Sequence, residues 1–434
     1  MNRLHPPEAV LEIADRLESA GYEAWCVGGA IRDALLGHPH LDWDLATSAT
    51  PKEVRSLFGS RQTIPVGVEF GTVGVLDRHG HMHEVTTFRR DVHTDGRHAV
   101  VEFGASLDED LARRDFTINA IAYSPRTGEI RDPFGGRADL ERKLVRAVGD
   151  PDERMREDRL RALRAIRFAA RFGFVLDSAT RAAIERSAPY LGRLSPERVK
   201  QELDKTMEQV RCPSSALVVW RDTGAFQSLI PALGGVSHEA LRVPDFLAQP
   251  GAPRRPARRA LRFAGLLASL SADVASDVMS GLRSSRQEIQ AVSLLVGRWH
   301  TIGGGMTRAL RSPDPIPDVD VRRWAAAIGR LQINAFMRLA SALWSADRDA
   351  HRSAPEPASI HRLYRRLLAI ALRDPIDLGS LAIDGDDLRR AGIPPGPRLG
   401  SILNALLESV LEDPARNTPD WLIEEAGRIF AAGG

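Results

Sequence analysis

The stretch GGAIRDALLGHPHLDWDLAT, residues 28–47, decides how the first part of this chain folds. Gly37 ends a short apolar segment, and the residues from Leu41 to Ala46 are predicted to form a strand. Side chains alternate between the two faces of a strand, so Asp42 and Asp44 would point the same way, about 7 Å apart. Such a pair of carboxylates can hold one or two magnesium ions, which prefer carboxylate and phosphate oxygens.

A glycine pair and an arginine precede the two aspartates. Gly28 and Gly29 would let the backbone approach a phosphate closely, and Arg32 would supply a positive charge to it. Glycines, arginine and paired carboxylates together indicate metal-assisted nucleotidyl transfer. An Asp-x-Asp pair alone is a weak signal, because such pairs also occur in solvated loops.

Length and composition describe an ordinary globular protein with more than one domain. The chain has 434 residues, 43% of them hydrophobic and 27% charged, which predicts two to four domains. No apolar run has the length of a membrane span or the form of a signal peptide. The net charge of +2 argues against a surface that binds polyanions everywhere. Cys26 and Cys212 are far apart and lack metal-ligand spacing, which favours reduced thiols in the cytoplasm.

Strand signals are confined to about the first 150 residues. Strands at 71–76 and 83–88 are predicted to form a hairpin. Beyond residue 150 the pattern is helical, with a single helix expected over 153–172 and a proline- and glycine-rich interruption at 302–317. The expected fold class is therefore α+β, with a small mixed β-sheet in the head and an all-helical remainder.

A second polar cluster follows the hairpin, in the segment Arg113-Arg114-Asp115-Phe116-Thr117-Ile118-Asn119. Arg114 could hold a phosphate, and Asp115 and Asn119 could position a ligand by hydrogen bonds. The alternative is a helix start with Asp115 near its cap and the arginines in solvent.

A third cluster lies in the expected helix over 153–172. Asp158, Arg161, Arg164 and Arg167 recur every three residues and would form a stripe along one side of that helix. The stripe is either a solvated face with ion pairs or a set of fixed donors and acceptors for a nucleobase edge. Arginine can donate two hydrogen bonds to base acceptors, and a carboxylate accepts from an amino group, so side chains could select a nucleotide without a template.

The order of these motifs resembles that of the class II CCA-adding tRNA nucleotidyltransferases and the related poly(A) polymerases. The matching motifs are Gly28-Gly29-x-x-Arg32-Asp33, Asp42-x-Asp44, Arg113-Arg114-Asp115-x-x-x-Asn119-Ala120, Asp132-Pro133-Phe134-Gly135-Gly136, Glu157-Asp158-x-x-Arg161-x-x-Arg164-Ala165-x-Arg167-Phe168 and Ser195-Pro196-Glu197-Arg198. The resemblance covers about residues 10–210, and residues 384–400 are similar to the family's tRNA-contacting C-terminal region.

The resemblance implies a role for each motif residue. Asp42 and Asp44 would bind the catalytic Mg²⁺ ions. Glu84, on the strand beside them, is a candidate third catalytic carboxylate, or else an exposed strand residue. The residues expected to contact the nucleotide, through its triphosphate or its base, are Gly29, Arg32, Arg114, Asp158, Arg161, Arg164 and Arg167.

The resemblance also implies four domains: a nucleotidyltransferase catalytic head (1–150), a neck with the nucleotide-selecting helix (151–215), a body (216–330) and a tRNA-binding tail (331–434). The expected reaction is addition of CCA from CTP and ATP to the 3′ end of a tRNA held by its acceptor stem, with release of pyrophosphate. Residues 88–98 resemble the family's flexible loop, which favours use of ATP. An A-adding tRNA enzyme, a poly(A) polymerase and an RNA-binding protein with an inactive head remain alternatives.

Overall fold

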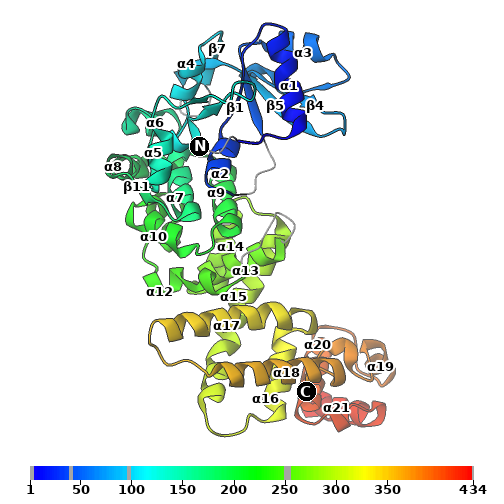
Figure 1. Ribbon diagram of the computed structural model, residues 1–434. Coiled ribbons are helices and arrows are strands. Elements are labelled where there is room, and N and C mark those ends of the chain that lie inside the picture. The colour runs from blue at the N-terminus through cyan, green and yellow to red at the C-terminus, as the bar shows by residue number, and fades with distance from the viewer. Residues whose placement is uncertain (1–3, 39–42, 95–98, 249–255, 433–434) are drawn as a thin grey trace. The chain divides into compact units, whose positions relative to one another are not determined.

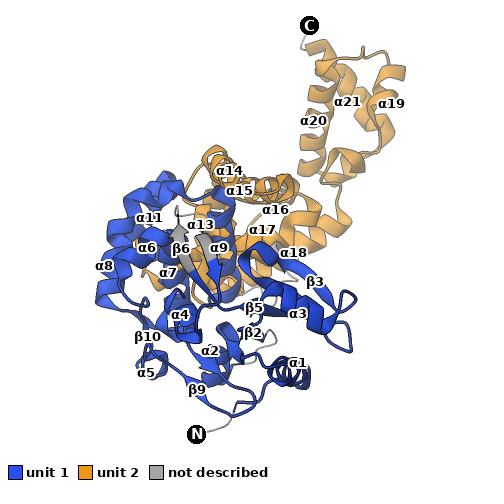
Figure 2. Ribbon diagram, turned by 90° about the horizontal axis from the view of Figure 1, so that it is seen from above, with its two compact units in different colours: residues 1–210, 215–235 blue, residues 211–214, 236–434 orange. Residues whose placement is uncertain are grey.

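The structure is a computed structural model that describes residues 4–38, 43–94, 99–248 and 256–432 (Figure 1). The chain divides into two compact units (Figure 2). Unit 1 comprises residues 1–210 and 215–235, and unit 2 comprises residues 211–214 and 236–434. Among the described residues, no helix combines the length and the apolar composition that a membrane crossing requires.

Unit 1 begins with a seven-stranded sheet in the order β3-β4-β5-β2-β1-β8-β9. β2 and β5 run parallel and the other neighbours antiparallel, so the predicted small mixed sheet is confirmed. The strands are β1 (Ala24–Val27), β2 (Asp44–Thr47), β3 (Thr63–Gly67), β4 (Thr72–Leu76), β5 (Met82–Thr87), β8 (Ala122–Tyr123) and β9 (Ile130–Arg131). The predicted hairpin is β4–β5.

Two helices that contact each other pack on this sheet. In α1 (Glu8–Ser19) the buried residues are Val10, Ile13, Ala14 and Leu17, a helical spacing that gives one apolar face against β1 and β2. α3 (Pro51–Phe58) starts at a Thr50–Glu53 capping box and contacts β4 and β5. The short α2 (Gly29–Leu35) follows β1 directly.

Shorter elements complete the head. β6 (Arg89–Thr94) and β7 (Ala99–Phe103) form a separate two-stranded sheet. α4 (Leu107–Ala112) has a capping box at Ser106, and its Leu107 and Leu111 enter a core with Val27 and Ala46. The remaining elements are η2 (Thr117–Asn119), α5 (Gly136–Glu141) and the parallel pair β10 (Leu144–Val145) and β11 (Val175–Leu176).

The single helix expected over 153–172 is wrong, because the chain forms two helices there. α6 (Pro151–Glu157) ends and α7 (Leu160–Phe172) begins around Asp158, whose backbone is extended at φ −147° and ψ 106°. The Asp158 carboxylate accepts a hydrogen bond from the Leu160 amide at 3.0 Å, which satisfies a free donor in the first turn of α7. Unit 1 continues with α8 (Ser178–Ser187), α9 (Pro196–Gln209), α10 (Ser214–Asp222) and α11 (Ala225–Leu229).

Unit 2 is helical throughout its described residues. Its longer helices are α13 (Pro256–Leu267), α14 (Ala272–Gly281), α15 (Arg286–Arg311), α16 (Asp318–Ile328), α17 (Ile333–Asp349), α18 (Pro357–Arg373), α20 (Pro397–Glu412) and α21 (Pro419–Ala432). The short helix α12 (His238–Leu241) precedes them, and the short helix α19 (Gly385–Arg390) lies between α18 and α20. The α+β prediction with a helical remainder is confirmed.

The interruption expected at 302–317 starts too early. α15 continues through the glycines at 303–305 as far as Arg311. A Cβ at Gly303 would lie 2.5 Å from the Trp299 ring, which packs edge-on against Trp344 with ring centroids 5.8 Å apart. The glycine therefore makes room for an aromatic side chain and does not end the helix.

Candidate functional site

The turn between β1 and α2 brings three groups of different chemistry together. Gly28 has φ 78° and ψ −139°, a conformation that side chains other than glycine rarely adopt. A Cβ at Gly28 would lie 3.2 Å from Nη1 of Arg114 and 3.9 Å from Oδ2 of Asp44. Backbone, guanidinium and carboxylate therefore converge beside the glycine turn. Asp42 lies outside the described residues.

The sheet register places a second carboxylate beside Asp44. β2 and β5 run parallel with Leu45 opposite Val85, and both of these side chains are fully buried. One residue earlier on each strand, Asp44 and Glu84 therefore share the other face of the sheet. Glu84 is exposed, and its carboxylate oxygens and those of Asp44 are the hard ligands that magnesium prefers.

The cysteine beside this site, Cys26 on β1, is fully buried. Burial, reinforced by the negative charge of Asp44, raises the pKa of the Cys26 thiol to about 12, so the thiol stays protonated. Among the described residues, which do not include Asp42, no three His, Cys, Asp or Glu side chains are grouped closely enough to hold a metal ion.

Arg114 is held by a carboxylate that the sequence reasoning missed. Its Nη2 donates to Oδ2 of Asp110 at 3.0 Å, and Nε of Arg113 donates to Oδ1 of the same carboxylate at 3.2 Å. Asp110 is 1% exposed, and the Arg114 Nε is buried with no hydrogen-bond partner among the described residues. Asp110 and Arg114 stand four residues apart in the sequence, a spacing that allows an ion pair at the end of α4, but no helix was predicted there.

Arg32 is not free at the glycine turn. Its Nε donates to Oδ1 of Asp33 at 2.8 Å, and its Nη1 donates to Oδ1 of Asn119 at 2.5 Å. A Cβ at Gly29 would lie 3.4 Å from its Nη2. Arg32 is 4% exposed, and burial lowers its pKa in spite of the neighbouring Asp33 carboxylate.

The Arg32 guanidinium also lies over two rings of α7. Its central carbon is 5.0 Å from the Phe168 ring centroid and 4.7 Å from that of Phe172, and the two rings stack 6.0 Å apart. This cation–π arrangement joins the β1–α2 turn to α7. Both arginines therefore lie beside the glycine turn, Arg114 next to Gly28 and the buried Arg32 next to Gly29.

Asp115 joins the head to α7 by a charged pair. Its Oδ2 accepts from Arg164 Nε at 2.9 Å, and its Oδ1 accepts from Asn119 Nδ2 at 2.8 Å. Burial alone would raise the pKa of this carboxyl, but the Arg164 charge and the hydrogen bonds outweigh burial and lower it. The same carboxylate raises the pKa of Arg164 against the effect of burial.

Asp158 and Arg161 lie where α6 meets α7, and each has a protein partner. Arg198 Nη2 donates to Oδ2 of Asp158 at 2.7 Å. Arg161 donates from Nη1 to Glu157 Oε2 at 2.5 Å and from Nη2 to the Arg113 carbonyl at 3.1 Å. Because Asp158 precedes α7, the predicted stripe along one helix begins only at Arg161.

Arg167 lies away from this cluster, in a buried ion pair with α9. Its Nε donates to Oε2 of Glu202 at 2.6 Å, and the two residues are 3% and 1% exposed. Burial lowers the pKa of Arg167, although the Glu202 carboxylate opposes that shift. Arg161, Arg164 and Arg167 therefore reach three places, which are the end of α4, Asp115 and α9 respectively.

Three protein families match parts of the chain. The poly(A) polymerase head domain matches residues 24–146. A family described as the probable RNA- and SrmB-binding site of polymerase A matches residues 173–234. A second domain of tRNA nucleotidyltransferases matches residues 316–426.

Relatives match the whole chain. A CCA-adding enzyme of Geobacillus kaustophilus is 36% identical over 97% of this chain and 98% of its own length, and one of Limosilactobacillus fermentum is 34% identical over 98% of both. The crystal structure of the Bacillus stearothermophilus CCA-adding enzyme in complex with CTP is 31% identical, with a TM-score of 0.72 over 99% of this chain and all of that one. The Thermotoga maritima CCA-adding enzyme complexed with tRNA, 21% identical, shares the fold with a TM-score of 0.66 over 100% of this chain and 97% of that one. The chain belongs to the family of CCA-adding enzymes.

Proposed function

We propose that this protein adds CCA to the 3′ ends of tRNAs, with CTP and ATP as donors and pyrophosphate as the leaving group. The observation that carries the proposal is the meeting of the Gly28 turn, Asp44 and Arg114 at one point of the head. A backbone turn and a guanidinium suit a triphosphate, and a carboxylate beside them suits the metal ion that accompanies it. Full-length likeness to CCA-adding enzymes supports the same reaction.

The metal would be held by Asp42 and Asp44, with Glu84 as a third carboxylate. The shared sheet face of Asp44 and Glu84 supports this assignment. Bound Mg²⁺ would lower the pKa of the attacking 3′ hydroxyl and balance charge on the departing pyrophosphate. The chain itself would supply position: the head orients the triphosphate and the neck orients the base.

Among the predicted nucleotide contacts, Gly29 and Arg114 would bind the triphosphate. Arg164 would lie near that site, because Asp115, the residue after Arg114, binds its guanidinium group. Arg161 has N–H groups that could donate hydrogen bonds to a base. Three of its five N–H donors contact Arg154, Glu157 and Arg113 in the described structure, which leaves two for a base edge.

Asp158 would accept from the amino group of the same base. Arg198 holds its carboxylate in place from α9. We assign Arg32 and Arg167 positioning roles, because each is buried and bound to a carboxylate.

The four-domain division into head (1–150), neck (151–215), body (216–330) and tail (331–434) is part of the proposal. The helical domains would hold the tRNA acceptor stem through its backbone and shape, as A-form RNA requires. The names of the families that match residues 173–234 and 316–426 support RNA contacts there. The cytoplasm remains the predicted compartment.

An A-adding enzyme or a poly(A) polymerase is the second candidate, because the head matches a poly(A) polymerase family. The experiment uses tRNA transcripts that end before CCA, after CC and after CCA, each with one labelled nucleotide at a time. CCA addition predicts CTP incorporation into the first, ATP into the second and neither into the third. ATP incorporation into all three would identify a poly(A) polymerase, and ATP into the second alone, with no use of CTP, an A-adding enzyme.

A further inference from the structure

An exposed tyrosine in unit 1 has two arginines against its ring. Tyr190 lies in η3 (Ala188–Arg193) and is 47% exposed. The guanidinium carbon of Arg159 is 4.9 Å from the ring centroid, and that of Arg193 is 5.4 Å from it. Arg159 also donates from Nη1 to Ser187 Oγ at 3.0 Å. Cation–π contacts therefore hold two positive charges beside one ring, and we call Arg159, Tyr190 and Arg193 the Tyr190 cluster.

No carboxylate binds the arginines of this cluster, among the residues that the structure describes. Arg159 and Arg193 form no ion pair there. Burial lowers the pKa of Arg159, and the positive charges of Arg193 and Arg156 lower it further. Asp152, a carboxylate near Arg156, is bound by Arg186 through both of its oxygens, at 2.9 and 2.7 Å. Positive charge therefore exceeds negative charge at this place.

Neighbouring arginines on α6 and α7 do have carboxylate partners. These paired arginines are Arg154, Arg161, Arg164 and Arg167. Repulsion between guanidinium groups that lack such partners costs free energy of folding, and a bound anion would remove that cost. An excess of like charge held in a fixed place therefore points to an anionic ligand.

The cluster and the proposed substrate site reach different elements. Arg159 contacts Ser187 and η3, whereas Arg161, two residues later, contacts the Arg113 carbonyl at the end of α4. The planar guanidinium group binds phosphate oxygens through two parallel hydrogen bonds. We propose that the Tyr190 cluster binds a compact phosphate anion, inorganic phosphate or pyrophosphate, at a place separate from the triphosphate site.

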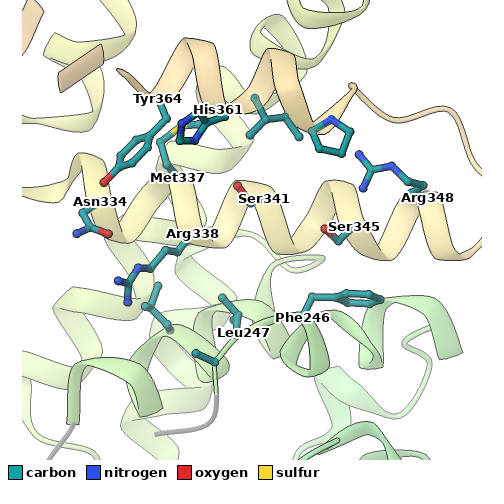
Figure 3. A pocket seen from close by; sticks show the side chains of 14 residues that line it. Phe246, Leu247, Asn334, Met337, Arg338, Ser341, Ser345, Arg348, His361 and Tyr364 are labelled. Carbon is teal, nitrogen blue, oxygen red and sulfur yellow. The ribbon is translucent and has the colours of Figure 1, made fainter. Parts of the chain in front are cut away.

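A cleft along α17 in unit 2 shows the contrast with a site for a long polyanion. The cleft has a volume of about 630 Å³, and Arg338 and Arg348 line it from the same helix (Figure 3). Both arginines fall within residues 331–434, which the proposed function assigns to tRNA. Cations that follow a groove suit a strand of RNA. Those of the Tyr190 cluster converge on one ring instead, which suits a compact anion.

The first test titrates inorganic pyrophosphate into the protein, with EDTA and without tRNA, so that neither magnesium nor the reaction interferes. Arg159→Gln and Arg193→Gln should each weaken the Kd about tenfold to a hundredfold, the loss of a hydrogen bond between charged groups. The matched control is Arg181→Gln, which removes the same charge from an exposed ion pair with Glu185 and should keep the wild-type Kd. An equal loss in the control, or the wild-type Kd in Arg193→Gln, would overturn the proposal. The same titration with inorganic phosphate identifies the occupant as the anion with the lower Kd.

Thermal unfolding separates a binding role from a structural one. In buffer free of phosphate, Arg193→Gln should unfold at the wild-type temperature or above it, because the change removes a repelling charge. Pyrophosphate should raise the Tm of the wild type and leave the Tm of Arg193→Gln unchanged. A lower Tm of Arg193→Gln without phosphate, together with the wild-type response to pyrophosphate, would mean that the ring contact is structural only, against the proposal.

Two further measurements distinguish other places and other sources of phosphate. Arg114→Gln, at the proposed triphosphate site, should keep the wild-type Kd for pyrophosphate. Loss of affinity in that variant but not in Arg193→Gln would place the anion in the substrate site and overturn the proposal. Arg193→Gln should also keep the wild-type Kd for tRNA. Weaker tRNA binding with unchanged pyrophosphate binding would mean that an RNA phosphate occupies the cluster, which would overturn the proposal too.

Discussion

Asp110 Oδ2 accepts a hydrogen bond from Arg114 Nη2 at 3.0 Å, and this pair fixes the guanidinium that faces the Gly28 turn. Asp110 is buried, and Arg113 contacts its other oxygen. The buried carboxylate binds both guanidinium groups, and it therefore restrains Arg114 before any substrate arrives. We infer that Asp110 is a positioning residue for triphosphate binding.

Asp110→Asn should raise KM for both CTP and ATP about tenfold with a smaller change in kcat. The amide keeps the shape of the side chain but loses the charge that holds Arg114. Steady-state kinetics at saturating tRNA measures the split between KM and kcat. The control is Asp108→Asn on the same helix, whose carboxylate makes an exposed ion pair with Arg131. An Asp110→Asn enzyme with the KM values of that control would refute the positioning role.

Arg32→Met should mainly lower stability. The change removes contacts with Asp33 and Asn119 and the stacking on Phe168 and Phe172, a loss of about 2–4 kcal/mol in the free energy of unfolding. Urea unfolding measures it, and Arg171→Met, at a more exposed arginine over the same Phe172 ring, serves as control. If stability is kept and only the KM for nucleotides rises, Arg32 contacts the triphosphate directly.

Asp158→Ala and Arg161→Ala should relax the choice of base. Each removes a base contact worth about 1–3 kcal/mol, so the preference for CTP and ATP over UTP and GTP should fall roughly fivefold to a hundredfold. Competition between labelled nucleotides on one tRNA measures this ratio. Arg186→Ala, which breaks an exposed ion pair with Asp152, is the control. A uniform loss of rate with unchanged preference would contradict selection by these side chains.

Deletion of His93 to Arg97 should lower the addition of A to tRNA and leave the addition of C intact. The segment includes His93 and Thr94, the last two residues of β6, and residues 95–98 lie outside the described part of the chain. One pocket must take CTP twice and then ATP, and the polar segment with Gly96 is the predicted moving element. C addition to a tRNA without CCA should survive, and A addition to one ending in CC should fall. Wild-type A addition by the deletion variant would exclude the segment as the switch.

Local patterns in the sequence predicted the head well. The hairpin expected at 71–76 and 83–88 is β4–β5, because alternation and turn residues are local signals. Contacts between distant residues could not be predicted. Arg32 and Asn119 are 87 positions apart, and only the fold shows that these two motif residues are hydrogen-bonded to each other. The division between α6 and α7 at Asp158 could not be predicted either, because the sequence pattern is helical on both sides of that residue.

The central claim is that a single carboxylate site serves both CTP and ATP. The most direct test measures the single-turnover rates at which the Asp44→Ala variant adds each nucleotide to tRNA. The account predicts that CTP and ATP incorporation both fall by roughly a thousandfold or more, because the metal ligand on β2 is gone. Binding of tRNA, measured on the same preparation, should stay at the wild-type Kd. Incorporation of either nucleotide within about tenfold of the wild-type rate would contradict the account.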